Sequence, residues 1–136
     1  MFVDIKAEMN TPTVRKIIAY AALDGSPAGV AKEVQTYQQS PALNFYAWVE
    51  DGTVIGICGY EIHEDHIEVH LISVDKQARG RRVGSAIIKA LRDRYRQEIR
   101  LETVDEAVGF YQKIGFMTRE FPDPTFNRKY RCTLMP

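Results

Sequence analysis

A chain of 136 residues is long enough to bury a hydrophobic core, and we expect one domain that spans residues 1–136. Hydrophobic residues make up 45% of the chain and charged residues 26%, which is typical of a soluble globular protein. No run is apolar for long enough to span a membrane, and the first six residues alternate polar with apolar side chains instead of forming a secretory leader. We therefore expect a cytoplasmic protein without membrane contact.

The formal net charge is zero, but the charges are distributed unevenly along the chain. Residues 1–70 carry four Lys and Arg against ten Asp and Glu, whereas residues 71–136 carry fourteen against eight. This asymmetry indicates a polyanionic partner, either nucleic acid or a phosphate-rich cofactor, or a solvated basic helix face. The arginines between Lys76 and Arg100 are interleaved with one aromatic residue, Tyr95, so we expect no nucleic acid.

The two cysteines indicate neither a disulfide framework nor a metal site. Cys58 and Cys132 lie in apolar runs that are typical of strands, and neither is part of a cluster of metal-ligand residues. We expect both thiols to be reduced core residues, and we expect no bound metal.

The N-terminal third predicts a strand and two helices. The strand covers residues 1–6, where polar and apolar residues alternate. Thr11 and Ser26 each precede a proline, and apolar residues at helical spacing follow both pairs, so each pair predicts a helix start. Gly25 is expected to end the first helix.

The middle of the chain predicts three neighbouring antiparallel strands. Residues 44–50 and 54–62 are joined at Asp51-Gly52, a strong signal for a two-residue hairpin turn. A second short turn at Glu64-Asp65 leads to a strand over residues 66–74. A basic turn follows, and a helix begins near Val83.

The C-terminal part predicts a crossover strand, a helix and a final hairpin. Residues 99–104 form a strand that should run parallel to residues 66–74, because a helix connects the two. Asp105 is expected to cap the next helix, Gly115 to end it, and residues 116–121 and 129–134 to pair around the loop 122–127. The fold class is α/β, with a mixed sheet of six to seven strands and about four helices.

The segment from Ile72 to Ala86 carries the strongest functional signal. It joins a strand end, a basic turn with glycines, and the first turn of a helix, where unpaired backbone N–H groups and the helix dipole favour an anion. Arginine guanidinium groups match phosphate oxygens, and glycines admit a ligand to the main chain. The alternative is an ordinary exposed basic turn.

Two motifs in this chain resemble those of the GNAT N-acetyltransferase family. The run 79–84 resembles the Arg/Gln-x-x-Gly-x-Gly/Ala loop that binds the acetyl-CoA pyrophosphate, although Arg82 stands where the family most often has glycine. The run 107–116 resembles the later A-x-x-F-Y-x-x-x-G-F segment. The resemblance covers essentially the whole chain, and it implies the acyl-CoA N-acyltransferase fold with two splayed parallel strands at the cofactor site.

This resemblance implies acetyl-CoA as donor, with CoA as product. The pantetheine arm would bond to the backbone of Ile72, Ser73 and Val74. The remaining implied cofactor contacts are Arg79, Gly80, Arg81, Arg82, Val83, Gly84, Ser85, Phe110 and Tyr111.

The resemblance also implies that Tyr111 is the general acid that protonates the thiolate, a role that suits a phenol. The alternative for Tyr111 is a core aromatic on an amphipathic helix. For the general base, Glu68 and then His70 are the candidates, because they share one face of their strand with His66 at period-two spacing. Glu102 on the next strand is a further candidate; the alternatives are a plain polar surface or a reaction that relies on solvent.

We therefore expect an N-acetyltransferase that moves an acetyl group to a primary amine of a small molecule or peptide. The alternative is a module of the same fold that binds CoA or docks a partner without catalysis. The resemblance implies an acceptor pocket from residues 11–40 and 122–127, and the acidic N-terminal half favours a cationic amine. The sequence leaves monomer and homodimer open.

Overall fold

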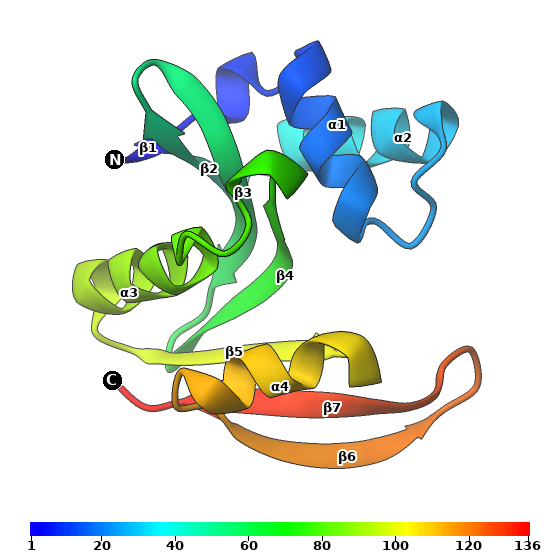
Figure 1. Cartoon of the computed structure of the whole chain (residues 1–136), viewed down its shortest axis with the longest axis vertical. Coiled ribbons are helices and arrows are strands. Elements are labelled where there is room, and N and C mark those ends of the chain that lie inside the picture. The colour runs from blue at the N-terminus through cyan, green and yellow to red at the C-terminus, as the bar shows by residue number, and fades with distance from the viewer.

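A seven-stranded mixed sheet organises the computed structural model, which describes residues 1–136 (Figure 1). The strand order is β1-β2-β3-β4-β5-β7-β6, and every neighbouring pair is antiparallel except β4 and β5. The strands are β1 (Phe2–Asp4), β2 (Leu43–Glu50), β3 (Thr53–Ile62), β4 (His66–Val74), β5 (Glu98–Thr103), β6 (Met117–Asp123) and β7 (Asn127–Leu134). The helices are α1 (Pro12–Ala21), α2 (Pro27–Gln39), α3 (Val83–Tyr95) and α4 (Asp105–Lys113). The predicted fold class and element order are confirmed, and two single 3-10 turns at Lys6–Glu8 and Lys76–Ala78 are added.

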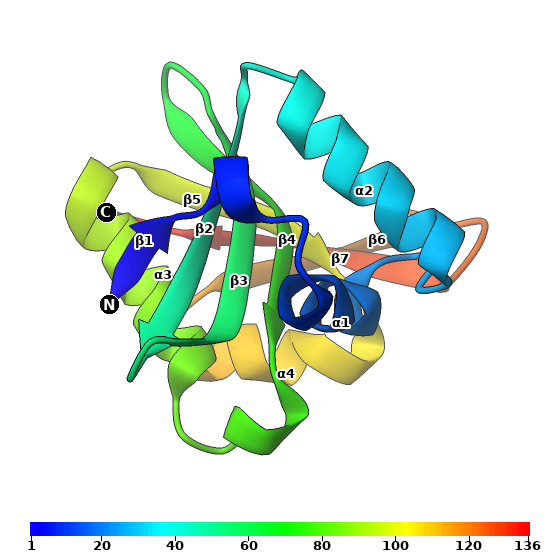
Figure 2. The ribbon, with the colours of Figure 1, turned by 90° about the horizontal axis from the view of Figure 1, so that it is seen from above.

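The helices cover the two faces of the sheet in pairs. In Figure 2, α1 and α2 lie on the viewer's side of the sheet and α3 and α4 lie behind it. Two separate hydrophobic clusters result, one containing Ile17, Phe45 and Ile57 under α1 and α2, and the other containing Ile87 and Tyr111 on the side of α3 and α4. None of the helices is long and apolar enough to cross a membrane.

The predicted local signals for helix starts and for the first hairpin are confirmed. The Thr11 hydroxyl accepts from the Val14 amide at 3.3 Å, and the Ser26 hydroxyl accepts from the Gly29 amide at 3.2 Å. Asp51 and Gly52 both have positive φ angles, 51° and 75°, as a two-residue hairpin turn that matches the strand twist requires.

Two helix boundaries differ from the prediction. Helix α1 ends at Ala21 and not at Gly25, because the backbone of Ala22 is already extended. Gly25 instead allows the chain to pass close to α1, since a Cβ at this position would lie 2.7 Å from the Ala19 carbonyl oxygen. Asp105 is the first residue of α4 rather than its cap, and its carboxylate accepts from Arg128 at 2.9 Å.

The last hairpin is tighter than predicted. Strand β6 extends to Asp123 and β7 begins at Asn127, so the connection is shorter than the expected loop 122–127. The Asp123 carboxylate accepts from the amides of Thr125 and Phe126, each at 2.9 Å, and Asn127 has a φ of 67°. Side-chain hydrogen bonds to the backbone of this kind stabilise a tight turn.

Candidate active site

The parallel strands β4 and β5 form a fork. They pair only at His66 with Glu98, Ile67 with Ile99 and Glu68 with Arg100, after which both strands continue without pairing each other. Beyond Glu68 the β4 backbone is therefore free on its β5 side up to Val74, where the basic turn begins. This divergence confirms the predicted splay, and it provides an exposed strand edge to which an extended ligand can bond.

A β-bulge in β4 lies just past the fork. Gly59 of β3 pairs with Leu71 and Tyr60 pairs with Val69, so His70 has no partner on β3. The bulge reverses the alternation of the strand, because Val69 belongs to the core beside α3 and α4 whereas Leu71 belongs to the core under α1 and α2. The period-two pattern of residues 66–74 does not indicate this change.

The basic turn between β4 and α3 has the geometry of an anion site. Gly80 has a φ of 82° and Arg82 a φ of 62°, both in the left-handed region that favours glycine. The Asp75 carboxylate accepts from the Gln77 amide at 3.2 Å and fixes the 3-10 turn. No side chain caps the N-terminus of α3, so its first amides keep no side-chain acceptor and can bind an anion.

The arginines of this turn make only weak surface contacts. Arg79 donates to the Val74 carbonyl oxygen at 3.3 Å, and its guanidinium lies 5.3 Å from the centre of the Tyr20 ring. Arg81 pairs with Glu50, while Arg82 is exposed and makes no ion pair. Exposed pairs of this kind contribute about 0–1 kcal/mol, so a phosphate group can replace them.

The other predicted cofactor residues also lie around the fork. Ser73 is buried, and the partly buried side chains of Ile72 and Val74 pack against the core. Val83 is buried and Ser85 is half-buried in the first turn of α3. These positions suit a pantetheine arm and a pyrophosphate, and the contacts themselves remain predictions.

Helix α4 approaches α3 at a glycine. A Cβ on Gly84 would lie 2.9 Å from the Phe110 ring, a distance at which one of the two must move. Phe110 therefore needs glycine at position 84, and its ring remains 39% exposed at the same place. The runs 79–84 and 107–116 thus meet in space.

Tyr111 lies on the α4 side of the fork in an apolar environment. Its ring is packed edge-on between Phe110, at 5.0 Å, and Phe116, at 5.4 Å. Burial raises the pKa of the Tyr111 phenol well above its usual value, with smaller contributions from the Cys58 and Cys132 thiols. The Tyr111 hydroxyl has no hydrogen-bond partner. Every side-chain oxygen or nitrogen that is fully buried in this protein has one, so the Tyr111 hydroxyl must still contact solvent. A phenol in this state holds its proton and is free to donate it.

The base candidates lie on the opposite side of the sheet, on a surface that we call the open face. Its residues are Glu61, His66, Glu68, His70 and Glu102. On the same side of the sheet, α1 packs against β3 and β4, and α2 packs against β2. Glu68 projects there because its neighbours Ile67 and Val69 are in the core beside α3 and α4. Tyr111 and Glu68 thus lie on opposite sides of the fork.

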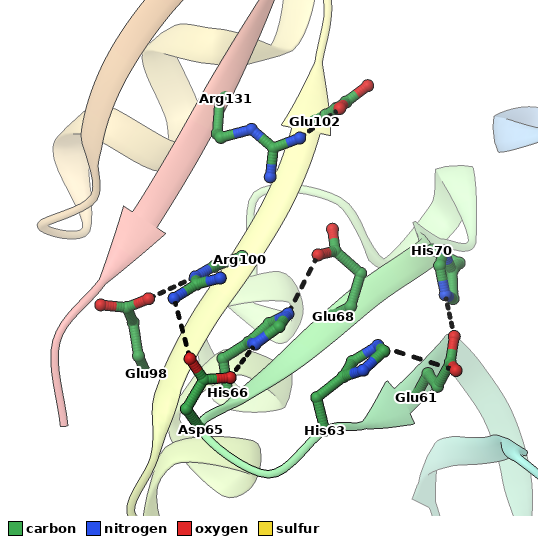
Figure 3. A network of polar contacts seen from close by, with 10 residues as sticks. All are labelled: Glu61, His63, Asp65, His66, Glu68, His70, Glu98, Arg100, Glu102 and Arg131. Atoms are coloured by element: carbon green, nitrogen blue, oxygen red, sulfur yellow. Dashed lines mark hydrogen bonds and ion pairs between the residues drawn. The ribbon is translucent and has the colours of Figure 1, made fainter.

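The three base candidates differ in their partners (Figure 3). The Glu68 carboxylate lies 3.4 Å from His66 Nε2, whereas His70 Nε2 contacts Glu61 at 3.0 Å instead. Glu102 is neutralised by Arg131 at 2.8 Å and Lys129 at 3.5 Å. Glu68 makes no direct ion pair with Lys or Arg, although the charge of Arg100 lies close to it, whereas Glu102 pairs with two cations. This difference favours Glu68 over Glu102 as a base.

The sequence did not indicate the partners of these residues. Asp65 was assigned only to a turn, yet its carboxylate contacts His66 Nδ1 at 2.7 Å and Arg100 at 3.7 Å. Glu61 comes from the neighbouring strand β3, and the β3–β4 register brings it to His70. Strand register places Arg100 near Asp65 and Glu61 near His70, whereas Asp65 and His66 are neighbours in the sequence.

Comparison with known proteins agrees with this geometry. The model of the family described as acetyltransferase (GNAT) matches residues 13–116. An uncharacterized N-acetyltransferase in the lysA 3' region of Bacillus methanolicus is 32% identical over 63 residues, which are 46% of this chain and 52% of that protein. The match thus spans about half the length of that relative.

Solved structures share the fold at low sequence identity. An aminoglycoside 6'-N-acetyltransferase complexed with coenzyme A superposes with a TM-score of 0.71, at 14% identity over 98% of this chain and 94% of its own. An IAA acetyltransferase from Bacillus cereus gives 0.69, at 18% identity over 98% and 97%. The family match covers well over half of the chain, and the chain therefore belongs to the GNAT acetyltransferase family.

Proposed function

We propose that the protein transfers an acetyl group from acetyl-CoA to a primary amine of a small molecule or peptide by direct attack. The observation that carries this proposal is the fork between β4 and β5, with the Tyr111 phenol on one side and the Glu68 carboxylate on the other. A proton donor and a proton acceptor on opposite sides of one opening suit a reaction that takes a proton from the amine and supplies one to the thiolate.

Donor binding uses the backbone more than the side chains. The amides at the start of α3, with Arg79, Arg81 and Arg82 around them, hold the pyrophosphate. The free edge of β4 from Ile72 to Val74 holds the pantetheine arm as an added strand would be held. Arg79 leaves the Val74 carbonyl when the cofactor arrives, because its contact there is a single hydrogen bond at 3.3 Å.

In the transfer step the amine nitrogen attacks the thioester carbon. The new C–N bond forms as the C–S bond breaks, Glu68 accepts the amine proton, and the thiolate takes the Tyr111 phenol proton. At the bulge, the backbone of His70 is not paired with β3. Its polar groups are therefore available to polarise the carbonyl oxygen of the thioester. His70 itself is the second candidate for the base, and its bond to Glu61 ties it to β3.

The acceptor enters over the open face, between the α1–α2 connection and the β6–β7 turn. These two segments expose Leu23 and Phe126, which are 82% and 43% exposed. Glu61 and Glu68 pair only with histidines, and the bond from His70 lowers the Glu61 pKa, so the Glu61 carboxylate is ionised near neutral pH. Two such carboxylates favour a positively charged amine, and added salt should weaken that preference.

Release of free thiol from acetyl-CoA tests the proposal directly. The acceptors are spermidine, tyramine, a lysine-containing tripeptide and an uncharged hydroxylated control without an amino group. We expect thiol release with at least one amine and none with the control. CoA that binds without any thiol release would favour the non-catalytic binding module instead.

A thermal shift tests the cofactor site separately. CoA should raise the melting temperature, because a ligand of the folded state stabilises it by mass action. Gly84→Leu should abolish the shift, since a side chain there meets Phe110 and the phosphate position. Gly109→Leu is the matched control, because a Cβ at Gly109 has no atom within 4 Å. An unchanged melting temperature at millimolar CoA would contradict acetyl-CoA as the donor.

A further inference from the structure

Helix α1 contacts the basic turn through two side chains on one side of the helix. Lys16 Nζ lies 3.5 Å from an Asp75 carboxylate oxygen, and the Tyr20 ring lies beside Lys76 and Arg79. Lys16 and Tyr20 are four residues apart in α1, so they face the same way (Figure 1). The resemblance placed the donor contacts on the turn, α3 and α4. Helix α1 adds a further wall to this turn.

Two cations share the half-buried ring of Tyr20. Lys76 Nζ lies 4.8 Å from the ring centre, and the guanidinium carbon of Arg79 lies 5.3 Å from it. Both distances are within the range over which the face of an aromatic ring attracts a cation. Both cationic side chains are exposed and long, so the ring is what holds their charged ends at one place.

The carboxylate next to these cations is already occupied. One oxygen of Asp75 pairs with Lys16 at 3.5 Å, and the other accepts from an amide of the 3-10 turn at 3.2 Å. Lys76 and Arg79 therefore keep their charges without a carboxylate partner. Two like charges beside one ring repel each other, and an anion between them removes that repulsion.

Arg79 can bind a phosphate without leaving the ring. Its Nε donates to the Val74 carbonyl oxygen at 3.3 Å, and its other N–H groups donate to no protein atom. A cation–π contact depends on the charge of the guanidinium and on the ring face, not on a hydrogen-bond acceptor. The contact with Tyr20 can therefore persist while the N–H groups turn to phosphate oxygens.

We propose that Tyr20 is a positioning residue of the donor site, which holds Lys76 and Arg79 ready for the pyrophosphate of acetyl-CoA; this rests on the proposed function, in which acetyl-CoA is the donor. Lys76 is then a further pyrophosphate-binding residue. Without the ring, both long side chains sample many rotamers and must be ordered when CoA binds, at a cost in free energy. The ring orders them in advance and takes no part in the acetyl transfer.

Calorimetric titration with CoA tests this role in Tyr20→Leu, with Tyr20→Phe as the matched control. Leu removes the aromatic face, so Kd for CoA should rise by about threefold to tenfold. Phe keeps the face, so Tyr20→Phe should bind CoA as the wild type does. In steady-state kinetics, Tyr20→Leu should raise KM for acetyl-CoA by a similar factor and keep kcat within about twofold, because the interaction is the same in the ground state and the transition state.

Lys76→Met tests the same site without touching α1. Lys76 is exposed, so this variant should fold normally, and Kd for CoA should rise by about threefold or more. Lys89→Met is the matched control, because Lys89 is an exposed lysine of α3 that pairs with Asp93 at 2.6 Å, and Kd should stay nearly unchanged. In the Tyr20→Leu background the effect of Lys76→Met should shrink, since the ring no longer holds the ammonium group.

A second titration with dephospho-CoA, which lacks only the ribose phosphate, identifies the phosphate group concerned. The loss in Tyr20→Leu should be the same for both ligands. A loss with CoA alone would place the two cations at the ribose phosphate and overturn the pyrophosphate assignment.

Four results would overturn the positioning role alone. They are an unchanged Kd in Tyr20→Leu, tighter CoA binding in Tyr20→Leu, an equal loss in Tyr20→Phe, and a loss in Tyr20→Leu that accompanies a lower melting temperature while Lys76→Met binds CoA normally. No CoA binding by the wild type would overturn the proposed function and the role of Tyr20 together.

Discussion

The two sides of the β4–β5 fork have opposite environments. On the side of α3 and α4, Tyr111 is 7% exposed and lies between Phe110 and Phe116. On the open face, Glu68 lies in a network of histidines and carboxylates that continues to exposed Asp65. One side is apolar and nearly dry, and the other is polar and wet.

The difference matches what each proton transfer requires. A general acid must keep its proton until the thiolate forms, and burial favours the neutral phenol. A base must lose its proton after each turnover, and that requires contact with water. The sheet separates the two demands, because adjacent residues of β4 and β5 point to opposite sides. Each prediction below perturbs one side and leaves the other as its reference.

The largest effect is expected on the dry side. Tyr111→Phe keeps the ring and its packing but removes the proton donor, so kcat should fall by about a hundredfold or more. The CoA dissociation constant should stay within about twofold, since only the transition state loses an interaction. Steady-state kinetics and calorimetric CoA titration measure both.

Tyr95→Phe is the matched control for this variant. It removes a phenol that bonds to Tyr60 at 2.6 Å near the C-terminal end of α3. We expect lower stability and near-normal kcat. Wild-type turnover in Tyr111→Phe would show that Tyr111 is structural or that thiolate departure does not limit the rate.

Local signals explain why most of the fold could be predicted. Thr11-Pro12, Ser26-Pro27 and Asp51-Gly52 set the backbone through hydrogen bonds and dihedral preferences within a few residues. The glycine and arginine turn at 79–84 is equally local. Such signals act the same way in any fold, so reading them requires no tertiary contacts.

Contacts across strands explain what the sequence did not indicate. The bulge at His70 depends on how β4 pairs with β3, and the contact of Arg100 with Asp65 depends on how β5 pairs with β4. Asp105 resembles a cap residue, but Arg128 on β7 takes its carboxylate. In each case the partner is chosen by register or packing, which one sequence does not reveal.

The next effect concerns the wet side. Glu68→Gln should lower kcat by about tenfold to a hundredfold, less than the loss in Tyr111→Phe, because a water molecule can replace a base on an open face. CoA binding should be unchanged. Glu120→Gln is the control, since Glu120 is an exposed carboxylate on β6 that pairs with Arg128. Equal turnover in Glu68→Gln and Glu120→Gln would remove Glu68 as the base.

The two sides should also differ in alkaline stability. The folded state raises the pKa of Tyr111 above its unfolded value of about 10, so above pH 10 the unfolded chain binds fewer protons than the folded one. The free energy of unfolding should therefore fall there, by up to about 1.4 kcal/mol per pH unit for this phenol.

Denaturant unfolding at several pH values between 9 and 11 measures this slope. Tyr111→Phe should remove the contribution of Tyr111 and leave those of Tyr37, Tyr60 and Cys58, whose pKa values are also raised by burial. Glu68→Gln should leave the slope unchanged, because an ordinary carboxyl is ionised in both states at these pH values. An identical slope in Tyr111→Phe and the wild type would contradict the apolar environment of the phenol.

The smallest effect isolates the departure from the family motif at Arg82. Arg82→Gly and Arg82→Ala both remove the charge, but only glycine adopts a φ of 62° without steric cost. We expect Arg82→Gly to be more stable than Arg82→Ala by about 1 kcal/mol in denaturant unfolding. The greater freedom of glycine in the unfolded chain reduces this difference in part.

Both variants should lose CoA affinity to a similar extent, because both lose the same guanidinium group. If the two variants unfold alike, the left-handed backbone at position 82 costs nothing. If CoA affinity falls only in Arg82→Ala, the positive charge at position 82 does not contribute to CoA binding. What matters there is then how closely the ligand can approach the backbone.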